Sequence, residues 1–575
     1  MDNVSEIGEA PLDRLIRQEM LRLGIRGLSI AVADDTGTLW SSGFGWADGS
    51  GKRAFASTTI SNIGSTSKLF TSTAIMRLVQ EGKIDLDAPI SRYLPEFQPR
   101  TGGYNLSAAT VRLLLTHHSG LQSDIWMNFM SGAHIPAGYP RPYMNNALLA
   151  SETSLCAAPG TVFSYSNLGF SLLGLIVEKA SGQDFPSYVH DTILAPLGMN
   201  SSSFLIEERF RDRYACGKLG LKKNMAIPYI RDMPAGSFNS SAEDMGRFLT
   251  AVIASAAGEE GGPLTGETQR EMWTRQNSGA ALDFDFSIGL AWWIMNLPSL
   301  PGELLVGHGG DLDPFCSFLI VDPARSLGVF VMVNSVKGMG SFSLSGIATE
   351  ALRTFGQAKG GPSFAAPLPA PAPASLPDSL ASRLAGDYAT SMGILRIRNK
   401  GSVLAIQAFG KWLEGYYRTD GSIALRAKIL GIVLPIPILK EICITPESLN
   451  GETFIALRIY GISIGIGRKI EAGTPRPAWR DRVGTWVRME RESAPFLKRA
   501  ALVVDRDTKH FLLSTTILGQ TGKYPIRTVS DDVAILEGSG RNLGSAIFVV
   551  HEGGTEILNV FGVKFRKLLE GDKVE

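Results

Sequence analysis

Apolar residues follow a helical spacing directly after a short polar segment near residue 65. The run ends at Gly82, and its apolar positions are Leu69, Phe70, Ala74, Ile75, Leu78 and Val79. This spacing predicts an amphipathic helix that the glycine terminates. The polar segment is Ser65-Thr66-Ser67-Lys68. We therefore expect Ser65 at a helix N-terminus, with Lys68 one turn further on and on the same face.

The hydrophobic pattern predicts a mixed α+β domain over residues 1–357. Strands come from both ends of this segment and helices lie between them, so we expect one antiparallel five-stranded sheet flanked by helices, with a helical second lobe. A cleft between the two lobes is a natural place for a site. Ser240 and Glu243 stand in capping-box register for one of the helices. The expected helices are 12–23, 109–115, 168–180, 240–251 and 343–355, and the expected strands are 28–33, 38–45, 304–307, 315–321 and 328–334.

The chain changes character after residue 357. Alternating proline and alanine over 358–377 predict a semi-rigid, extended linker. Short alternating strands separated by Gly, Asn and Asp turns follow it and are typical of small antiparallel barrels. A second proline-rich interruption at 473–477 divides this region. We predict a lipocalin-like β-barrel at 378–474 and a second barrel at 478–575, with a single barrel as the alternative.

Composition narrows the class of function. Lys and Arg number 56 against 55 Asp and Glu, so there is no charge excess that would favour a nucleic-acid partner. The four cysteines are far apart and follow no metal-ligand spacing, which suggests a reducing compartment without a disulfide framework. With 575 residues the chain is too long for one hydrophobic core.

Targeting signals are not evident in the sequence. The N-terminus is acidic and no signal-peptide pattern follows it, so we expect a cytoplasmic protein, with a processed periplasmic or secreted form as the alternative. No apolar run is long enough for a transmembrane segment. The most apolar stretch, 429–439, contains two prolines, and we expect it to form a buried strand pair rather than a membrane-touching loop.

Ser65 and Lys68 are candidates for nucleophilic catalysis. A serine hydroxyl is a poor nucleophile until a base removes its proton, and a lysine can be that base when burial or a positive neighbour lowers its pKa. Unpaired N–H groups at the helix N-terminus would lie where an oxyanion develops. The alternative is an N-capping serine beside a solvated lysine.

Two further motifs carry suitable chemistry. Tyr165 can relay a proton if a cation such as Lys68 lowers its pKa, and the Asn167 amide can hold Lys68 or a substrate amide. His308, followed by Gly309, Gly310 and Asp311, stands at the end of an expected strand, where it can fix a substrate carboxylate or help proton transfer. The Asp311 N–H can complete an oxyanion hole with the Ser65 N–H. The alternatives are a turn tyrosine with an N-cap asparagine, and a glycine-rich turn between strands.

The order of these three motifs resembles the serine β-lactamase and penicillin-binding-protein superfamily, in its class C β-lactamase-related branch with esterases and D-aminopeptidases. Supporting stretches are 113–121, 159–160, 234–237 and 289–293. The resemblance implies a β-lactamase-like domain over 1–357 and an acyl-enzyme on Ser65, with Lys68 and Tyr165 sharing acid and base duty. It also implies small-molecule or short-peptide substrates and, as in D-aminopeptidases, a barrel loop that reaches the active site.

The resemblance leaves alternatives open within the superfamily. The His308 motif departs from the Lys-Thr-Gly of true β-lactamases, which puts efficient β-lactam turnover in doubt. A serine hydrolase cleaving an amide or ester is the leading interpretation. The alternatives are a penicillin-binding-type protein that is acylated without efficient turnover, and an acyltransferase. No cofactor or metal is implied, and a homodimer is left open.

Two other patterns are decoys. Residues 461–465 fit the G-x-S-x-G nucleophile elbow around Ser463, but no helix follows them, so we expect a glycine-rich barrel strand. His117 and His118 are adjacent without a third ligand at metal spacing, and we expect a structural role at a helix end.

Overall fold

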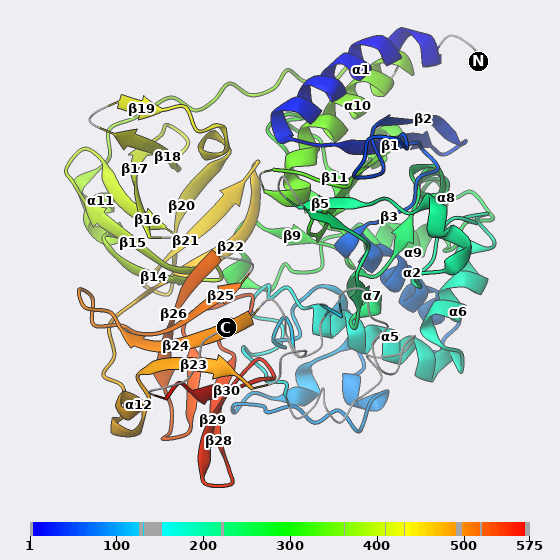
Figure 1. The fold of residues 1–575 in the computed structure, drawn as a ribbon. Coiled ribbons are helices and arrows are strands. Elements are labelled where there is room, and N and C mark those ends of the chain that lie inside the picture. The colour runs from blue at the N-terminus through cyan, green and yellow to red at the C-terminus, as the bar shows by residue number, and fades with distance from the viewer. Residues whose placement is uncertain are drawn as a thin grey trace.

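The computed structural model describes residues 4–125, 130–131, 152–219, 223–337, 339–360, 363–408, 410–429, 432–489, 497–517 and 520–569. They form an α+β domain followed by two closed antiparallel β-barrels, which confirms the predicted fold class. Figure 1 shows both barrels on one flank of the α+β domain. No helix in the described part of the chain has the length and apolar character needed to cross a bilayer.

An antiparallel sheet forms the centre of the α+β domain. Its strand order is β2-β1-β13-β12-β11-β10-β9, so strands from both ends of the segment pair, and Leu28 lies opposite Val333. The five long strands correspond to the five predicted, although β11 continues beyond the predicted end at residue 307 to Leu312, and the two short strands β10 and β9 extend the edge to seven. The bounds are β1 Gly27–Asp34, β2 Thr38–Gly45, β9 Ser287–Ile288, β10 Trp293–Met295, β11 Leu305–Leu312, β12 Phe315–Asp322 and β13 Leu327–Val333.

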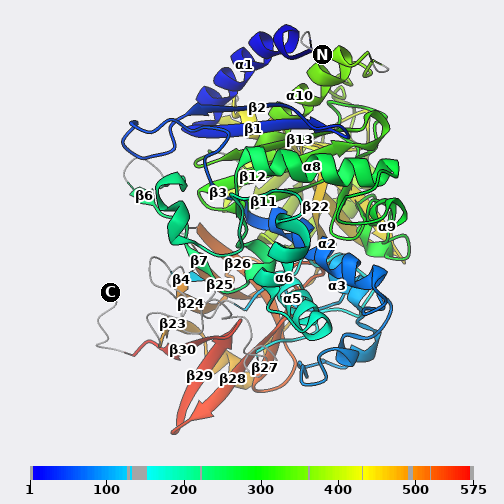
Figure 2. The same cartoon turned by 90° about the vertical axis from the view of Figure 1, so that its right-hand side faces the viewer.

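Helices cover both faces of this sheet. Alternate residues of β1 point to opposite faces, so Ile30 packs in the core beneath α1 and α10, and Ala31 packs in the core that includes α8. Figure 2 shows α1 and α10 on the opposite side of the sheet from α8. The bounds are α1 Val4–Leu23, α8 Ala242–Ala257 and α10 Ser345–Ala358.

The second lobe is helical and is built around α2 (Ser67–Gln80) and α5 (Asn167–Ser181). The hydroxyl of Ser166 caps α5 by accepting a hydrogen bond from the Gly169 N–H, and α5 ends at Gly182 in a left-handed conformation. A 3₁₀ turn over Gly64–Thr66 leads into α2 and carries Ser65. The other helices are α3 Val111–Leu115, α6 Phe185–Val189, α7 Met233–Gly236 and α9 Gly266–Met272.

Two local predictions were wrong by small shifts. The N-cap of α8 is Ser241, whose hydroxyl accepts a hydrogen bond from the Asp244 N–H, whereas Ser240 belongs to β8 (Asn239–Ser240) and pairs with Ser61. That pairing holds Ser240 in the extended strand, so the cap moves one residue on. The His308 motif lies inside β11 rather than at its end, because β11 continues to Leu312 in pairing with β12.

The first barrel closes through pairing of β17 with β18, and β19 is an additional strand on β18. The described part of the linker runs along this barrel, where the Ala374 N–H donates to the Tyr417 carbonyl. The bounds are β14 Gly386–Thr390, β15 Gly393–Asn399, β16 Leu404–Ala408, β17 Lys411–Tyr417, β18 Ile423–Ile429, β19 Ile432–Leu434, β20 Ile442–Leu449, β21 Glu452–Ile459 and β22 Ile462–Ile470, after the short helix α11 Asp378–Leu384.

The expectation of a buried strand pair at 429–439 is half right. Strands β18 and β19 do pair, but Ile432 is 68% exposed and Val433 is 47% exposed. The reason is topological: β19 lies outside the closed ring of strands, so no second layer covers it.

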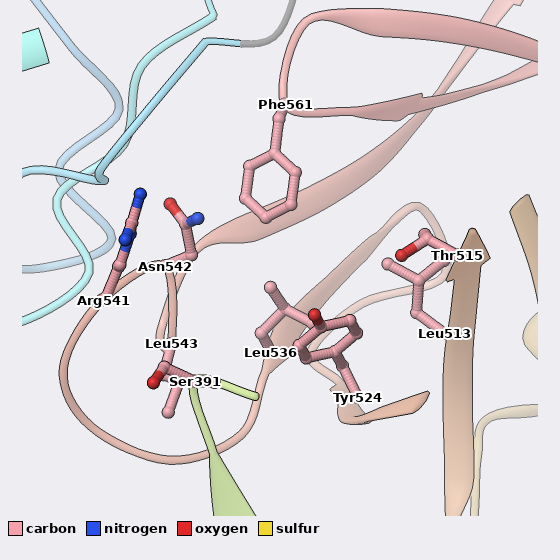
Figure 3. Close-up of a pocket in the computed structure, with 9 residues that line it drawn as sticks. All are labelled: Ser391, Leu513, Thr515, Tyr524, Leu536, Arg541, Asn542, Leu543 and Phe561. Carbon is pink, nitrogen blue, oxygen red and sulfur yellow. The ribbon is translucent and has the colours of Figure 1, made fainter. Parts of the chain in front are cut away.

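The second barrel is a ring of consecutive strands that closes when β23 pairs with β30. A cavity of about 30 Å³, enough to hold water, lies against this barrel and is lined by residues such as Tyr524 and Phe561 and also by Ser391 of the first barrel (Figure 3). The bounds are β23 Gly484–Arg488, β24 Leu497–Val504, β25 Phe511–Ile517, β26 Gln520–Thr528, β27 Val533–Leu536, β28 Ala546–Glu552, β29 Thr555–Val560 and β30 Val563–Lys567, after the short helix α12 Pro477–Asp481.

The loop between β27 and β28, residues 537–545, docks the second barrel on the α+β domain. The Asn542 Oδ1 accepts a hydrogen bond from the Ser123 N–H at 3.0 Å, and the Ser545 Oγ lies 3.1 Å from the Cys156 Sγ. Figure 3 shows Arg541 and Asn542 extending from this loop toward the blue and cyan segments of the α+β domain. We refer to residues 537–545 as the docking loop.

Candidate active site

Ser65 and Lys68 lie together at the start of α2, as predicted. The 3₁₀ turn presents Ser65 partly exposed, and the Lys68 side chain one turn later is fully buried. The Lys68 Nζ is 3.2 Å from the Ser65 Oγ. The alternative of a solvated lysine is therefore wrong, because the amine faces the serine hydroxyl inside the protein.

Two other acceptors surround the Lys68 amine. Its Nζ lies 2.8 Å from the Asn167 Oδ1 and 2.6 Å from the Ala235 carbonyl oxygen. A neutral amine has two N–H groups and one lone pair. If Asn167 and Ala235 accept the two N–H groups, the lone pair faces the Ser65 hydroxyl. This arrangement fits a base that removes the serine proton.

The electrostatic surroundings favour the neutral amine. Burial lowers the pKa of Lys68 well below its usual value, because the charged form loses hydration. The charge of Asp124 opposes this shift and raises the pKa, whereas the Arg541 guanidinium lowers it further. Loss of hydration is the largest of these effects, so Lys68 has the property that a general base needs.

The Asn167 amide is held at both ends by the protein. Its Oδ1 accepts from Lys68, and its Nδ2 donates to the Asp124 Oδ1 at 2.7 Å. The other Asp124 oxygen accepts a hydrogen bond from the Ser123 Oγ at 2.5 Å. Asp124 therefore fixes the orientation of the amide so that its oxygen faces Lys68. Of the two roles predicted for Asn167, holding Lys68 is the one that the geometry displays.

Tyr165 meets the same group of side chains from the segment before α5. The Lys68 Nζ is 4.8 Å from the centre of the Tyr165 ring. Burial raises the pKa of Tyr165, although the hydrogen bond with Ser65 and the Arg541 charge lower it in part. The prediction that Lys68 lowers the pKa of this phenol is therefore wrong. Tyr165 stays protonated at neutral pH and can donate a proton.

Two histidines fix the segment that carries Tyr165. The His117 ring stacks on the Tyr165 ring at 4.3 Å, and its Nδ1 accepts a hydrogen bond from the Ser166 N–H at 3.0 Å. The His118 Nε2 lies 2.7 Å from the Asp283 Oδ2, and the other oxygen of Asp283 accepts from the Phe163 N–H. The described residues contain no cluster suited to a metal. Both histidines thus have the structural role expected of them.

His308 reaches the site from β11 and is fully buried. Its ring stacks on Trp293 at 4.5 Å, and its centre lies 6.3 Å from that of Tyr165. Burial lowers the pKa of His308 to about 3, and the Lys68 charge adds to this effect. The Nδ1 lies 2.6 Å from the Gly309 carbonyl oxygen, which can only accept, so Nδ1 carries the proton and Nε2 is a bare acceptor. A neutral imidazole of this kind is a poor partner for a carboxylate.

Strand β11 approaches the Ser65 turn closely because its glycines have no side chain. A Cβ on Gly310 would lie 1.9 Å from the Ile63 carbonyl oxygen, and a Cβ on Gly64 would lie 2.4 Å from the Asp311 N. The Asp311 N is therefore packed directly against the residue before Ser65. This proximity is what the predicted oxyanion hole requires.

Arg541 of the docking loop completes the group. Its Cζ lies 5.4 Å from the centre of the Tyr165 ring, and its Nε donates to the Ser123 Oγ at 3.2 Å. Its NH2 is 3.7 Å from the Asp124 Oδ2, and 52% of its side chain is exposed. Arg541 of the second barrel is therefore in contact with Tyr165, one of the predicted catalytic residues.

Sequence reasoning missed Asp124, Ala235 and Arg541 as site residues. Asp124 closely follows the stretch 113–121, and Ala235 lies within 234–237, so both residues are near stretches that supported the family resemblance. The resemblance implied that a barrel loop reaches the active site, and the loop at 537–545 does so. Nothing in the sequence identified this loop, or Arg541 within it, as the one beside Tyr165.

The G-x-S-x-G decoy lies in β22, where the Ser463 Oγ donates to the Asp285 Oδ1 at 2.8 Å. The strand continues to Ile470, so the strand–turn–helix of a nucleophile elbow is not formed here. The expectation of a barrel strand is confirmed.

Comparison with known proteins agrees with this geometry. The family model described as Beta-lactamase matches residues 12–349. Protein flp of Staphylococcus aureus is 26% identical over 330 residues, a match that covers 56% of this chain but only 62% of that protein. Esterase EstB of Burkholderia gladioli is 28% identical over 396 residues, which is 60% of this chain and 94% of the esterase.

Solved structures show the same fold. A penicillin-binding protein homologue from Pyrococcus abyssi, described as octameric, matches with a TM-score of 0.53 at 24% identity and covers 80% of this chain and 99% of its own. A class C β-lactamase matches with a TM-score of 0.50 at 22% identity and covers 61% of this chain and 98% of its own.

Proposed function

The chain belongs to the β-lactamase family, and we propose that it is a serine hydrolase that cleaves a small amide or ester through an acyl-enzyme on Ser65. The observation that carries this proposal is the position of Lys68, buried and 3.2 Å from the Ser65 hydroxyl with two other acceptors for its N–H groups.

Acylation starts with proton removal. The neutral amine of Lys68 takes the Ser65 proton while the serine oxygen attacks the substrate carbonyl carbon. The carbonyl oxygen becomes an oxyanion, which the Ser65 and Asp311 N–H groups stabilise. Tyr165 then donates its phenolic proton to the departing amine or alcohol, and the Lys68 ammonium returns a proton to the phenolate.

Deacylation uses the same groups. Water attacks the acyl carbon, and neutral Lys68 accepts its proton. Collapse of the second tetrahedral intermediate breaks the bond to the Ser65 oxygen, which recovers a proton from the Lys68 ammonium. An amine or alcohol in place of water would make the enzyme an acyltransferase.

Ester cleavage has a specific observation in its favour, since the EstB match covers nearly the whole length of that esterase. Amide cleavage of the D-aminopeptidase kind is the second candidate, because a loop of a C-terminal barrel lies at the site. A penicillin-binding-type protein that remains acylated is the third.

The test is a panel of short p-nitrophenyl esters and D-alanyl p-nitroanilides, with Ser65→Ala and Ser463→Ala as matched variants. We expect wild type and Ser463→Ala to turn over at least one class and Ser65→Ala to fall to background. Mass spectrometry after a fluorescent penicillin would reveal stable acylation of Ser65 without turnover, which would favour the third candidate. Cleavage that survives Ser65→Ala would overturn the proposal.

A further inference from the structure

Strand β19 leaves apolar side chains exposed at the outer end of the first barrel. Ile432 is 68% exposed, Val433 is 47% exposed, and Ile436, just after the strand, is 37% exposed. Figure 1 shows β19 at the upper left of the protein, away from the α+β domain and from the second barrel. Neighbouring apolar side chains that stay exposed in this way are typical of a surface that contacts a partner.

A tryptophan of the neighbouring strand extends this apolar surface. Trp412 of β17 is 51% exposed. Glu414 lies opposite Arg426 in the antiparallel pairing of β17 with β18, so Trp412 lies toward the end of β18 where β19 pairs with it. Trp412 and Glu414 share a face of β17, and the Glu414 carboxylate is 2.8 Å from the Lys428 Nζ. Because Lys428 lies opposite Val433, the indole and the apolar residues of β19 lie at one end of the barrel.

Basic residues accompany these apolar side chains. Among the described residues at this end of the barrel, the exposed lysines are Lys411, Lys428 and Lys440. Lys440 ends the 3₁₀ turn Pro437–Lys440, which packs against β18. The acidic residues near them are Glu414, which pairs with Arg426 as well as with Lys428, and the exposed Glu441. Cations therefore outnumber acids here, although the whole chain is balanced at 56 Lys and Arg against 55 Asp and Glu.

The edge of β19 is poorly suited to pairing with a strand of another molecule. The strand has only three residues, and Pro435 directly after it has no N–H to donate. The next N–H, that of Ile436, donates to the Leu434 carbonyl oxygen at 2.9 Å. A second copy of the chain would therefore find little backbone with which to extend the sheet.

An anionic lipid surface fits all of these features. It takes up apolar side chains without needing a backbone partner, and indole rings are favoured at the depth of the lipid headgroups. Lysines are attracted to the negative charge of those headgroups. The few apolar side chains of β19 reach only the boundary between headgroups and acyl chains, so such a contact is peripheral and reversible.

We propose that this end of the first barrel docks on an anionic lipid bilayer. The apolar side chains of β19 and Ile436 enter the boundary between headgroups and acyl chains, Trp412 lies among the headgroups, and the lysines lie close to the lipid phosphates. The inference goes beyond the proposed reaction and does not depend on it, since none of these residues belongs to the group around Ser65.

Co-sedimentation of the full chain with vesicles tests this inference. One set of vesicles contains phosphatidylcholine alone, and the other contains phosphatidylcholine and phosphatidylserine in equal amounts. The measured quantity is the partition coefficient of the protein. We expect binding to the mixed vesicles to exceed binding to the neutral ones by about tenfold or more, because each lysine near an anionic surface contributes about fivefold. Added salt should reduce this preference, since it screens surface charges.

Two double variants separate the apolar contribution from the charge. Ile432→Ser with Val433→Ser keeps every charge and should lower the partition coefficient on mixed vesicles by about tenfold or more. Lys411→Glu with Lys440→Glu keeps the apolar side chains and should remove the preference for anionic lipid.

The matched control is Val504→Ser with Val529→Ser. It changes two valines of the second barrel that are 42% and 45% exposed, and it should bind vesicles as the wild type does. Thermal unfolding of each variant checks that the fold is kept.

Two results with vesicles would overturn the inference: no binding of the wild type to the mixed vesicles, or equal binding of the wild type and the Ile432→Ser, Val433→Ser variant. Analytical ultracentrifugation without vesicles tests the other occupant of this surface. A wild-type dimer that the same variant dissociates would also overturn the inference, because a second copy of the chain would then cover β19.

Discussion

The Asn167 side chain accepts a hydrogen bond from Lys68 at 2.8 Å while its nitrogen is tied to Asp124. The Asp124 carboxylate can only accept a hydrogen bond, so the nitrogen of the Asn167 amide must face Asp124. The amide oxygen therefore faces Lys68. Asp124 is therefore a positioning residue for the proposed base, acting through Asn167.

We expect Asp124→Asn to lower kcat by about tenfold to a hundredfold, because an asparagine lets the Asn167 amide turn away from Lys68. The Asp124 charge raises the pKa of Lys68, so its removal should also move the acid limb of the pH profile to lower pH. Kinetics against pH check both effects. Asp191→Asn, an exposed carboxylate, is the control, and a profile that shifts to higher pH would contradict the prediction.

The pH profile of the wild type follows from the lowered pKa of Lys68. The base works when it is neutral, so kcat/KM should fall as pH drops through that pKa and should already be level well below about 10.4, the ordinary lysine value. Lys68→Arg should be inactive, because a guanidinium stays charged. An acid limb at the ordinary lysine pKa would show that burial does not lower the pKa of Lys68 in the working enzyme.

Tyr165→Phe should lower kcat by about 10²- to 10⁴-fold, because it removes the proton donor and leaves the ring that stacks on His117. The pKa of Tyr165 is raised, so its ionisation should cause no loss of wild-type activity below about pH 10. Steady-state kinetics and thermal unfolding of the variant separate catalysis from stability. An unchanged kcat would assign the proton transfer to another group.

Gly310→Ala should destabilise the fold and impair the site together. Its Cβ would lie 1.9 Å from the Ile63 carbonyl oxygen, so β11 must move away from the Ser65 turn. A cost of about 1–3 kcal/mol in the free energy of unfolding is typical of such overpacking. Calorimetry and kcat measure the two effects. Gly279→Ala, where a Cβ meets nothing within 4 Å, is the control and should change neither.

The sequence was sufficient to predict the elements that depend on the local pattern of apolar and polar residues. The spacing of apolar residues after Lys68 predicted α2 and the face shared with Ser65, and the order of motifs placed Tyr165 and His308 in one site. Alternation and turn residues were enough to predict two barrels. Each of these features is encoded by neighbours within a few residues or by a motif.

Other parts depend on long-range packing and could not be predicted. The raised pKa of Tyr165 and the neutral state of His308 follow from burial, which no spacing reveals. The short strands β10 and β9 are only three and two residues long, which is too short for the alternation of apolar and polar residues to be recognised. Arg541 reaches Tyr165 only because the second barrel docks through Asn542 and Ser545.

The docking of the last barrel has a consequence for the order of events during synthesis. Ribosomes make the nucleophile and its base early, but the arginine beside Tyr165 belongs to the second barrel and is made much later. A nascent polypeptide with a folded first domain still lacks this cation and the contacts that Asn542 makes with Ser123. The complete group of side chains around Tyr165 therefore forms only after the second barrel has been made and has docked.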